Sequence, residues 1–235
     1  MPHFPSYDQT LLWYDEQGTG KPLVCLPGGP GADVRTLGDL GGLAEHRRLI
    51  RLDSRAGGRS AIPADQVTCA FAEQARDVEE LRKHLGLADI DLLAHSAGTL
   101  TAQEYAARYG VHRLVLVTPA GRAAREPDEA EAAAIRAAGV ATAEPVNPTF
   151  PPEWLRAAFY AGGSTDASRL ARLAAVTSPV LAIAGAADPL AGTSTARLVG
   201  SLYPDVTVEV LPGCGHHPWL DDPDLFRGRL LAFLA

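Results

Sequence analysis

The alternation of short apolar runs with amphipathic helical patterns is the feature that most restricts the fold of this 235-residue chain. Runs of about four to eight residues rich in Val, Ile and Leu, bounded by polar residues or glycine, are typical of buried strands. Such runs lie at Leu11–Tyr14, Pro22–Leu26, Arg48–Leu52, Ile90–Ala94, Leu114–Thr118, Val180–Ala184 and Thr207–Leu211. Strands that alternate with helices predict an α/β fold, in which helices flank a mostly parallel central sheet.

Two segments have the apolar spacing of helices that lie on a protein surface. In residues 71–85 one apolar stripe runs between charged residues, and Gly86 follows as a helix stop signal. Residues 223–235 repeat this pattern and are predicted to form the last helix of the fold.

One region interrupts the alternation. From Gly121 to Ser178 the chain is rich first in Ala, Glu and Arg, then in Pro, and then helical again, with no run that resembles a strand. We interpret residues 121–178 as a short helical lid inserted into a core domain formed by residues 1–120 and 179–235. A chain of this length is within the range of a single domain.

Composition disfavours several classes of partner. The chain has 21 Lys and Arg against 28 Asp and Glu, a net charge of −7, which disfavours nucleic acid. Its three cysteines, Cys25, Cys69 and Cys214, are widely spaced and form no metal-binding or dithiol motif. No apolar run is long enough to span a bilayer, and the first residues lack the features of a secretion signal. We therefore expect a cytoplasmic monomer or homodimer with no membrane partner, metal or other cofactor.

The stretch LLAHSAGTL, residues 92–100, places a serine between two small residues. Ala94 stands two positions before Ser96, and Gly98 stands two positions after it. A strand that turns abruptly into a helix around a nucleophile needs small residues at these places, because larger ones would clash with neighbouring elements. Ser96 as a plain helix N-cap is the alternative. The apolar run before the serine and the helical pattern after it favour the nucleophile.

A serine hydroxyl needs a base to become nucleophilic, and the base needs an acid to orient it. Asp188 follows a late strand, and His216 follows the next one, so the chain order is Ser, Asp, His. Asp188 as a turn residue and His216 as an ordinary loop histidine are the alternatives. His216 is preferred over His217 because it directly follows the GCG turn, and the elbow serine makes a thiol nucleophile at Cys214 unnecessary.

Together these segments resemble the α/β-hydrolase superfamily and, within it, the prolyl iminopeptidase-like group. The resemblance rests on LPGGPG (residues 26–31), DSRAGGRS (residues 53–60), AHSAGT (residues 94–99), the Asp188 loop and the GCGH loop. It implies an α/β-hydrolase fold with a Ser96, Asp188 and His216 triad. It also implies that the backbone amides of Gly29 and Ala97 hold the oxyanion of acyl transfer, with Gly28 as an alternative donor.

Other residues near these motifs have expected roles. Asp53 and Arg55 are predicted to brace their loop through turn hydrogen bonds and an ion pair. Trp154, Phe159 and Tyr160 are candidates for the lining of a substrate pocket, with packing of the lid onto the sheet as the alternative.

These patterns predict a serine hydrolase that cleaves a small-molecule ester or amide through an acyl-enzyme. One alternative is a prolyl iminopeptidase-type aminopeptidase, a group that the resemblance associates with acidic lid residues for the free amine. Glu144 and Glu153 are the candidates for that task. The other alternative is a ligand-binding protein without catalysis, because one fold hosts many functions.

Overall fold

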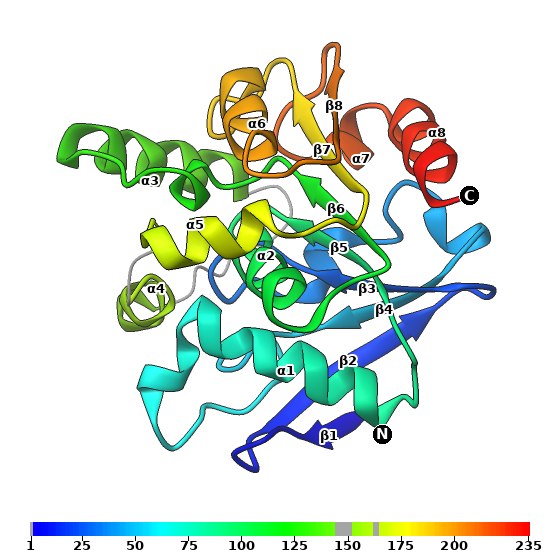
Figure 1. Cartoon of the computed structure of the whole chain (residues 1–235), viewed down its shortest axis with the longest axis vertical. Helices are drawn as coiled ribbons and strands as arrows, with labels where there is room; N and C mark the ends of the chain where they lie inside the picture. Colours follow the sequence, from blue (N-terminus) through cyan, green and yellow to red (C-terminus); the bar gives the residue numbers. More distant parts are fainter. Residues whose placement is uncertain (1, 144–151, 162–164) are drawn as a thin grey trace.

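The computed structural model describes residues 2–143, 152–161 and 165–235, and its strands form one sheet (Figure 1). The sheet has eight strands in the order β1-β2-β4-β3-β5-β6-β7-β8. Strands β3 to β8 are parallel, whereas β2 runs antiparallel to β4 and β1 antiparallel to β2 at one edge. This topology confirms the predicted α/β fold with a mostly parallel sheet. The strand bounds are β1 (His3–Pro5), β2 (Leu11–Gln17), β3 (Pro22–Leu26), β4 (Arg48–Leu52), β5 (Asp91–His95), β6 (Arg113–Val117), β7 (Val180–Gly185) and β8 (Val206–Leu211).

All seven predicted strands are present, and β3 and β4 have the predicted bounds. The additional strand β1 is only three residues long and contains a proline, so its sequence carries no periodicity. It is a strand because its backbone pairs with β2, from His3 opposite Trp13 to Pro5 opposite Leu11.

Successive strand residues point to opposite faces of the sheet, and each face is covered by different helices. Leu92 and Ala94 belong to the apolar cluster beneath α1 (Phe71–His84), α2 (Gly98–Tyr109) and α6 (Thr193–Gly200). Leu93, between them, belongs to the cluster on the other face. That face is covered by η1 (Val34–Leu37), η2 (Leu43–Glu45), α7 (Pro218–Asp221) and α8 (Pro223–Leu234). The predicted surface helices correspond to α1 and α8.

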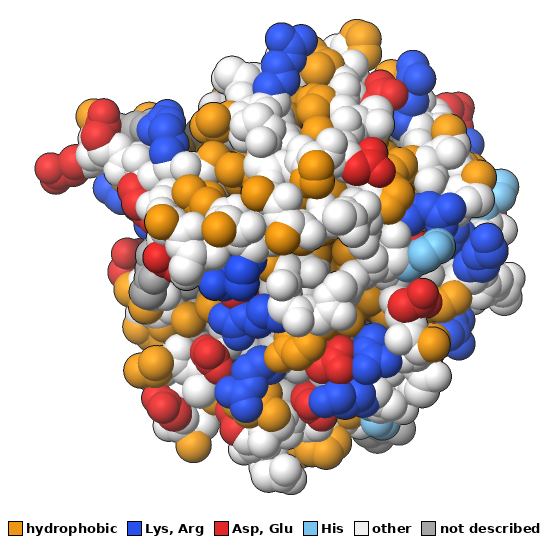
Figure 2. All heavy atoms as spheres, viewed as in Figure 1, with side chains coloured by type: hydrophobic (Ala, Val, Ile, Leu, Met, Phe, Trp, Pro, Cys, Tyr) orange, Lys and Arg blue, Asp and Glu red, His pale blue; other side chains and the backbone are white. Residues whose placement is uncertain are grey.

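The chain between β6 and β7 is helical where it is described. It contains η4 (Gly121–Ala123), α3 (Glu129–Ala143), α4 (Glu153–Phe159) and α5 (Ala167–Ala174). Helix α5 lies against α2, where Arg172 pairs with the buried Glu104 at 3.1 Å. Helix α4 lies against η3 (Gln66–Cys69), and α3 projects from the body of the molecule (Figures 1 and 2). No helix in the described ranges has the length and apolar character needed to cross a bilayer.

Candidate active site

Ser96 lies at the corner between the end of β5 and the start of α2. Its φ is +50°, a backbone conformation that residues other than glycine rarely adopt. Gly98 explains why a small residue is needed here, because a Cβ at this position would lie 2.2 Å from the carbonyl oxygen of Pro27. Ala94 is completely buried on the other side of the serine. The local backbone is therefore the strained strand-to-helix turn that the sequence predicts.

Asp188 and His216 come from the loops that follow β7 and β8, at the same edge of the sheet as Ser96. His216 Nε2 lies 3.0 Å from Ser96 Oγ, and His216 Nδ1 lies 2.8 Å from Asp188 Oδ2. The two loops touch closely, since a Cβ on Gly185 would lie 2.1 Å from the carbonyl oxygen of Gly215. The structure thus brings the three predicted side chains into one hydrogen-bonded chain.

The carboxyl group of Asp188 is buried and fully engaged. Its Oδ1 accepts a hydrogen bond from the Leu190 N–H at 2.8 Å, and its Oδ2 faces His216. Burial alone raises the pKa of Asp188, but the hydrogen bond and charge of His216, together with the backbone amides of Leu190 and Ala191, outweigh burial and hold that pKa below its ordinary value. Asp188 is therefore a carboxylate that orients the imidazole.

His95 is a site residue that the sequence reasoning missed. Its Nε2–H donates to the carbonyl oxygen of His216 at 3.0 Å, and Thr118 Oγ1 donates to the same oxygen at 3.2 Å. Burial, with the neighbouring charges of His216 and His217, holds the pKa of His95 well below its ordinary value. A neutral His95 therefore helps to fix the backbone of His216. The sequence offered one signal for this role, because His95 directly precedes Ser96.

A cavity of about 350 Å³ opens beside Ser96, and Gly29, Ala97 and Tyr160 line it. Within the described chain, neither the Gly29 amide nor the Ala97 amide donates a hydrogen bond. Gly28, the alternative donor, lines a different cavity.

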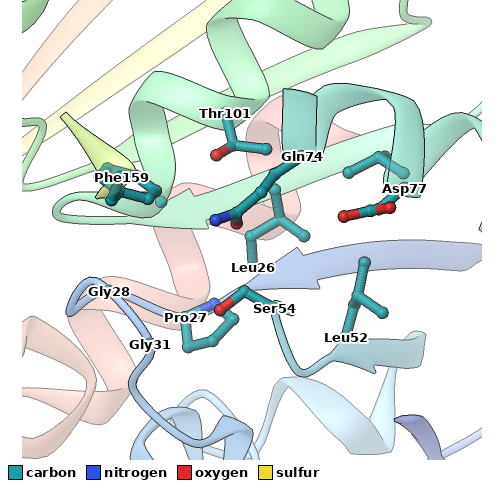
Figure 3. Close-up of a pocket in the computed structure, with 12 residues that line it drawn as sticks. Leu26, Pro27, Gly28, Gly31, Leu52, Ser54, Gln74, Asp77, Thr101 and Phe159 are labelled. Atoms are coloured by element: carbon teal, nitrogen blue, oxygen red, sulfur yellow. The ribbon is translucent and has the colours of Figure 1, made fainter. Parts of the chain in front are cut away.

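That second cavity lies between α1, α2 and the loop after β3 (Figure 3). Figure 3 shows Gln74 and Thr101 entering it from α1 and α2, with Phe159 at one end. Its volume of about 20 Å³ holds one water molecule and excludes a substrate. Phe159 is buried here and packs on Phe71 at 5.9 Å between ring centroids.

Of the three aromatic residues predicted to line a substrate pocket, the described structure brings only Tyr160 to the cavity beside Ser96. Phe159 packs α4 onto α1, which is the alternative role considered for these residues. Trp154 is half-buried and lines neither cavity. Residues at helical spacing point in different directions, so adjacent aromatics do not share one pocket.

Four arginines line the cavity beside Ser96, and the sequence reasoning missed them. They are Arg122, Arg125, Arg136 and Arg156. We refer to these four residues as the arginine cluster. Their signal in the sequence is weak, because charged residues on a helical segment usually face solvent. Only the three-dimensional placement of the chain between β6 and β7 brings them to the cavity that Ser96 also lines.

The acidic candidates for an amine do not join this lining. Glu153 is exposed at the start of α4 and is absent from the described lining of the cavity. Glu144 lies outside the described residues.

The remaining predicted residues, Asp53, Arg55 and Cys214, are buried. Asp53 is buried and accepts hydrogen bonds from the amides of Val34 and Arg59 at 2.8 and 2.9 Å. Arg55 is also buried, and its ion pairs are with Asp77 of α1 and with Asp8. These contacts agree with the predicted bracing of the loop. The side chain of Cys214 is buried in the apolar core.

Two esterases of known structure share the fold. The thermophilic esterase from Thermogutta terrifontis, solved with malate bound, superposes with a TM-score of 0.78 at 22% identity, over 99% of this chain and 97% of its own. The esterase RhEst1 from Rhodococcus sp. ECU1013 superposes with a TM-score of 0.78 at 25% identity, over 99% of this chain and 98% of its own. Similarity at this level establishes the fold and leaves the substrate open.

Sequence comparison gives the family. The proline iminopeptidase of Heyndrickxia coagulans is 34% identical over 92 residues, which are 39% of this chain. The match spans 32% of that relative, about a third of its length. The family model for the alpha/beta hydrolase fold matches residues 21–143, more than half of this chain. The resemblance read from the motifs is confirmed, and the chain belongs to the α/β-hydrolase fold family.

Proposed function

We propose that this protein is a serine hydrolase that cleaves a small-molecule ester or amide through a covalent acyl-enzyme. The observation that carries the proposal is the hydrogen-bonded chain from Ser96 Oγ through His216 to Asp188, at 3.0 and 2.8 Å. The serine lines a cavity in which the amides of Gly29 and Ala97 are unengaged within the described chain. In this proposal the nucleophile and the two oxyanion donors line one cavity, and the base and the orienting acid are connected to the nucleophile by hydrogen bonds.

In the proposed reaction, the Ser96 hydroxyl donates its proton to His216 Nε2 as its oxygen attacks the acyl carbon. The carbonyl oxygen becomes an oxyanion, and the N–H groups of Gly29 and Ala97 stabilise it. His216 then protonates the leaving alcohol or amine, which leaves the acyl group on Ser96. Water, deprotonated by His216, attacks this ester, and His216 returns the proton to Ser96 Oγ as the acid is released. Asp188 holds the imidazole tautomer throughout.

We also propose that residues 121–178 form a lid over this reaction. Arg122, Arg156 and Tyr160 from this segment line the same cavity as Ser96. A cover of this kind excludes water from the site and provides side chains that contact the part of the substrate away from the reacting bond.

Replacement of the nucleophile tests the proposal. Ser96→Ala removes the attacking oxygen, and we expect turnover of p-nitrophenyl acetate to fall about a thousandfold or more. Labelling by a fluorophosphonate probe should disappear with it. Ser201→Ala removes an exposed hydroxyl from the end of α6 and is the control, with wild-type turnover and labelling. Unchanged turnover or labelling in Ser96→Ala would contradict the proposal.

A second candidate, prolyl iminopeptidase activity, is favoured by the relative from Heyndrickxia coagulans. The arginine cluster in the cavity opposes it, because a free peptide N-terminus is itself positively charged at neutral pH. Comparison of proline p-nitroanilide with p-nitrophenyl acetate separates the two activities. We expect the ester to be the better substrate by kcat/KM. Hydrolysis of neither substrate, without probe labelling, would instead support a ligand-binding protein that lacks catalysis.

A further inference from the structure

We propose that the substrate of this site carries an anionic oxygen group, a carboxylate or a phosphate, which the arginine cluster binds while Ser96 attacks the ester or amide carbonyl. This inference rests on the proposed function and specifies its substrate class. It starts from the charge of the cavity. Four of the described lining residues are arginines, and none is an Asp or Glu. Guanidinium groups match the paired oxygens of carboxylates and phosphates and hold them by bidentate hydrogen bonds.

Two of these arginines converge on one aromatic side chain. The guanidinium carbon of Arg122 lies 4.5 Å from the ring centroid of Tyr160, and that of Arg156 lies 5.5 Å from the same centroid. Both guanidinium groups therefore lie beside Tyr160, which itself lines the cavity. An anion bound beside Tyr160 would be attracted by both guanidinium groups.

Arg156 is the better anchor of the two. Arg122 already pairs with Glu126, at 2.9 Å, so part of its charge is compensated. Arg156 is half-buried, and in the described ranges no carboxylate pairs with it. A guanidinium that is partly withdrawn from water and that keeps its donors free is suited to a ligand oxyanion.

The rest of the described cavity wall is mainly apolar and does not compete for the anion. It includes Ala132, Ile135, Pro189, Leu190, Ala191 and Leu198. The cavity volume of about 350 Å³ fits a small molecule. A short aliphatic chain with the reacting carbonyl at one end and an anionic group at the other matches this distribution of surface.

A pair of esters that differ in charge and by one methyl group tests the inference. The mono-p-nitrophenyl ester of glutaric acid carries a carboxylate, and its methyl-capped analogue has the same chain and no charge. We expect the anionic ester to have a kcat/KM about tenfold higher or more, since one charge-assisted hydrogen bond is worth about that factor. Added salt should reduce the preference, because it screens the guanidinium charges.

Substitution of Arg156 tests whether the arginine cluster causes this preference for the anionic ester. Arg156→Gln should lower kcat/KM for the anionic ester about tenfold and leave the neutral ester within about twofold. Arg229→Gln removes the same charge from an exposed position on α8 and is the matched control, with both values unchanged. Unfolding midpoints of both variants exclude loss of structure as the cause.

Binding to the Ser96→Ala variant gives a readout that does not depend on turnover. Calorimetry would compare monomethyl glutarate and monobutyl phosphate with the neutral dimethyl glutarate. Tighter binding of either anion, lost on addition of Arg156→Gln, supports the inference, and the tighter of the two anions identifies the oxygen group.

Equal binding of charged and neutral probes, or equal kcat/KM for the two esters, would overturn the anionic substrate. Ester hydrolysis that depends on Ser96 would leave the proposed function intact in that case. Conversely, turnover that survives Ser96→Ala would remove the proposed mechanism, while the binding comparison would still decide the role of the arginines.

Discussion

At the scale of single residues, the position of the Ser96 hydroxyl depends on the small size of its neighbours Ala94 and Gly98. The φ of +50° at Ser96 holds its side chain at the corner between β5 and α2. Beside it, main chain from the loop after β3 passes through the space that a Cβ on residue 98 would fill. The two-residue spacing of Ala94 and Gly98 around the serine is therefore a packing requirement that the sequence displays directly.

The packing requirement at Gly98 predicts a specific loss. Gly98→Ala puts a methyl group 2.2 Å from the carbonyl oxygen of Pro27, so α2 or the loop must move. We expect the free energy of unfolding to drop by about 1–3 kcal/mol, as for other overpacked positions. Ester turnover should fall with it, because Ser96 and Ala97 move too. Urea unfolding and p-nitrophenyl acetate kinetics measure the two effects.

Gly228→Ala is the control for this change. Gly228 lies in α8, and an added Cβ there meets no atom within 4 Å. In a helix interior, alanine is favoured over glycine by about 1 kcal/mol, so this variant should be as stable as the wild type or more stable. Equal stability of Gly98→Ala and Gly228→Ala would show that the close contact at Gly98 is not rigid.

At the scale of elements, the sequence indicated most of the sheet but only part of its surroundings. Apolar runs located seven strands, because burial leaves a compositional signal, which is strongest in the fully buried strands β5 and β7. Strand β1 and the short helix α6 lack that signal, since their structure depends on pairing and packing with distant segments.

The same limit applies to the site. Ser96, Asp188 and His216 follow strands, and the order of strands in a parallel sheet brings such loops together. Arg156 and Tyr160 lie on helical segments outside the sheet, where spacing alone does not say which face points inward. The convergence of the arginines on the cavity was therefore not predictable from one sequence.

The loop of residues 53–60 is joined to helix α1 by a buried ion pair. Arg55 is completely buried, and its Nε donates to Asp77 Oδ2 at 2.8 Å while its Nη1 donates to Asp8 at 2.7 Å. Ser6 also donates to Asp77, so the N-terminal segment is connected to the same group. This network holds three separate segments in register beside the sheet.

Removal of one partner of this network should be costly. Asp77→Asn leaves the buried Arg55 without its main counter-charge, and we expect a loss of about 3–5 kcal/mol in the free energy of unfolding. Asp224→Asn, which breaks the exposed pair with Arg227 on α8, is the matched control and should cost about 1 kcal/mol or less. Urea denaturation compares the two, and similar losses would mean that the buried network contributes no more than a surface pair.

At the scale of the whole molecule, the candidate active site is assembled from loops at one edge of the sheet, and His95 and His217 pack against His216. Burial and the charge of His216 lower the pKa of His217 to about 4, from an ordinary value of 6.5. The pKa of His95 is lowered by the same causes. Burial raises the pKa of Asp53 to about 6. The contribution of this carboxyl to stability therefore changes with pH in the direction opposite to that of the two histidines. The site thus couples the stability of the fold to pH.

The sign of this coupling follows from where each proton binds. Between about pH 6.5 and 4 the unfolded chain protonates residue 217 and the native protein does not, so stability falls as the pH falls. For His217 this loss is about 2 kcal/mol between about pH 7.5 and 5. His217→Gln should therefore have a shallower decline of unfolding free energy with pH than the wild type. His46→Gln, which removes an exposed histidine, should keep the wild-type decline. Urea unfolding at a series of pH values measures the slopes, and a wild-type slope in His217→Gln would mean that this histidine takes up its proton in the folded protein.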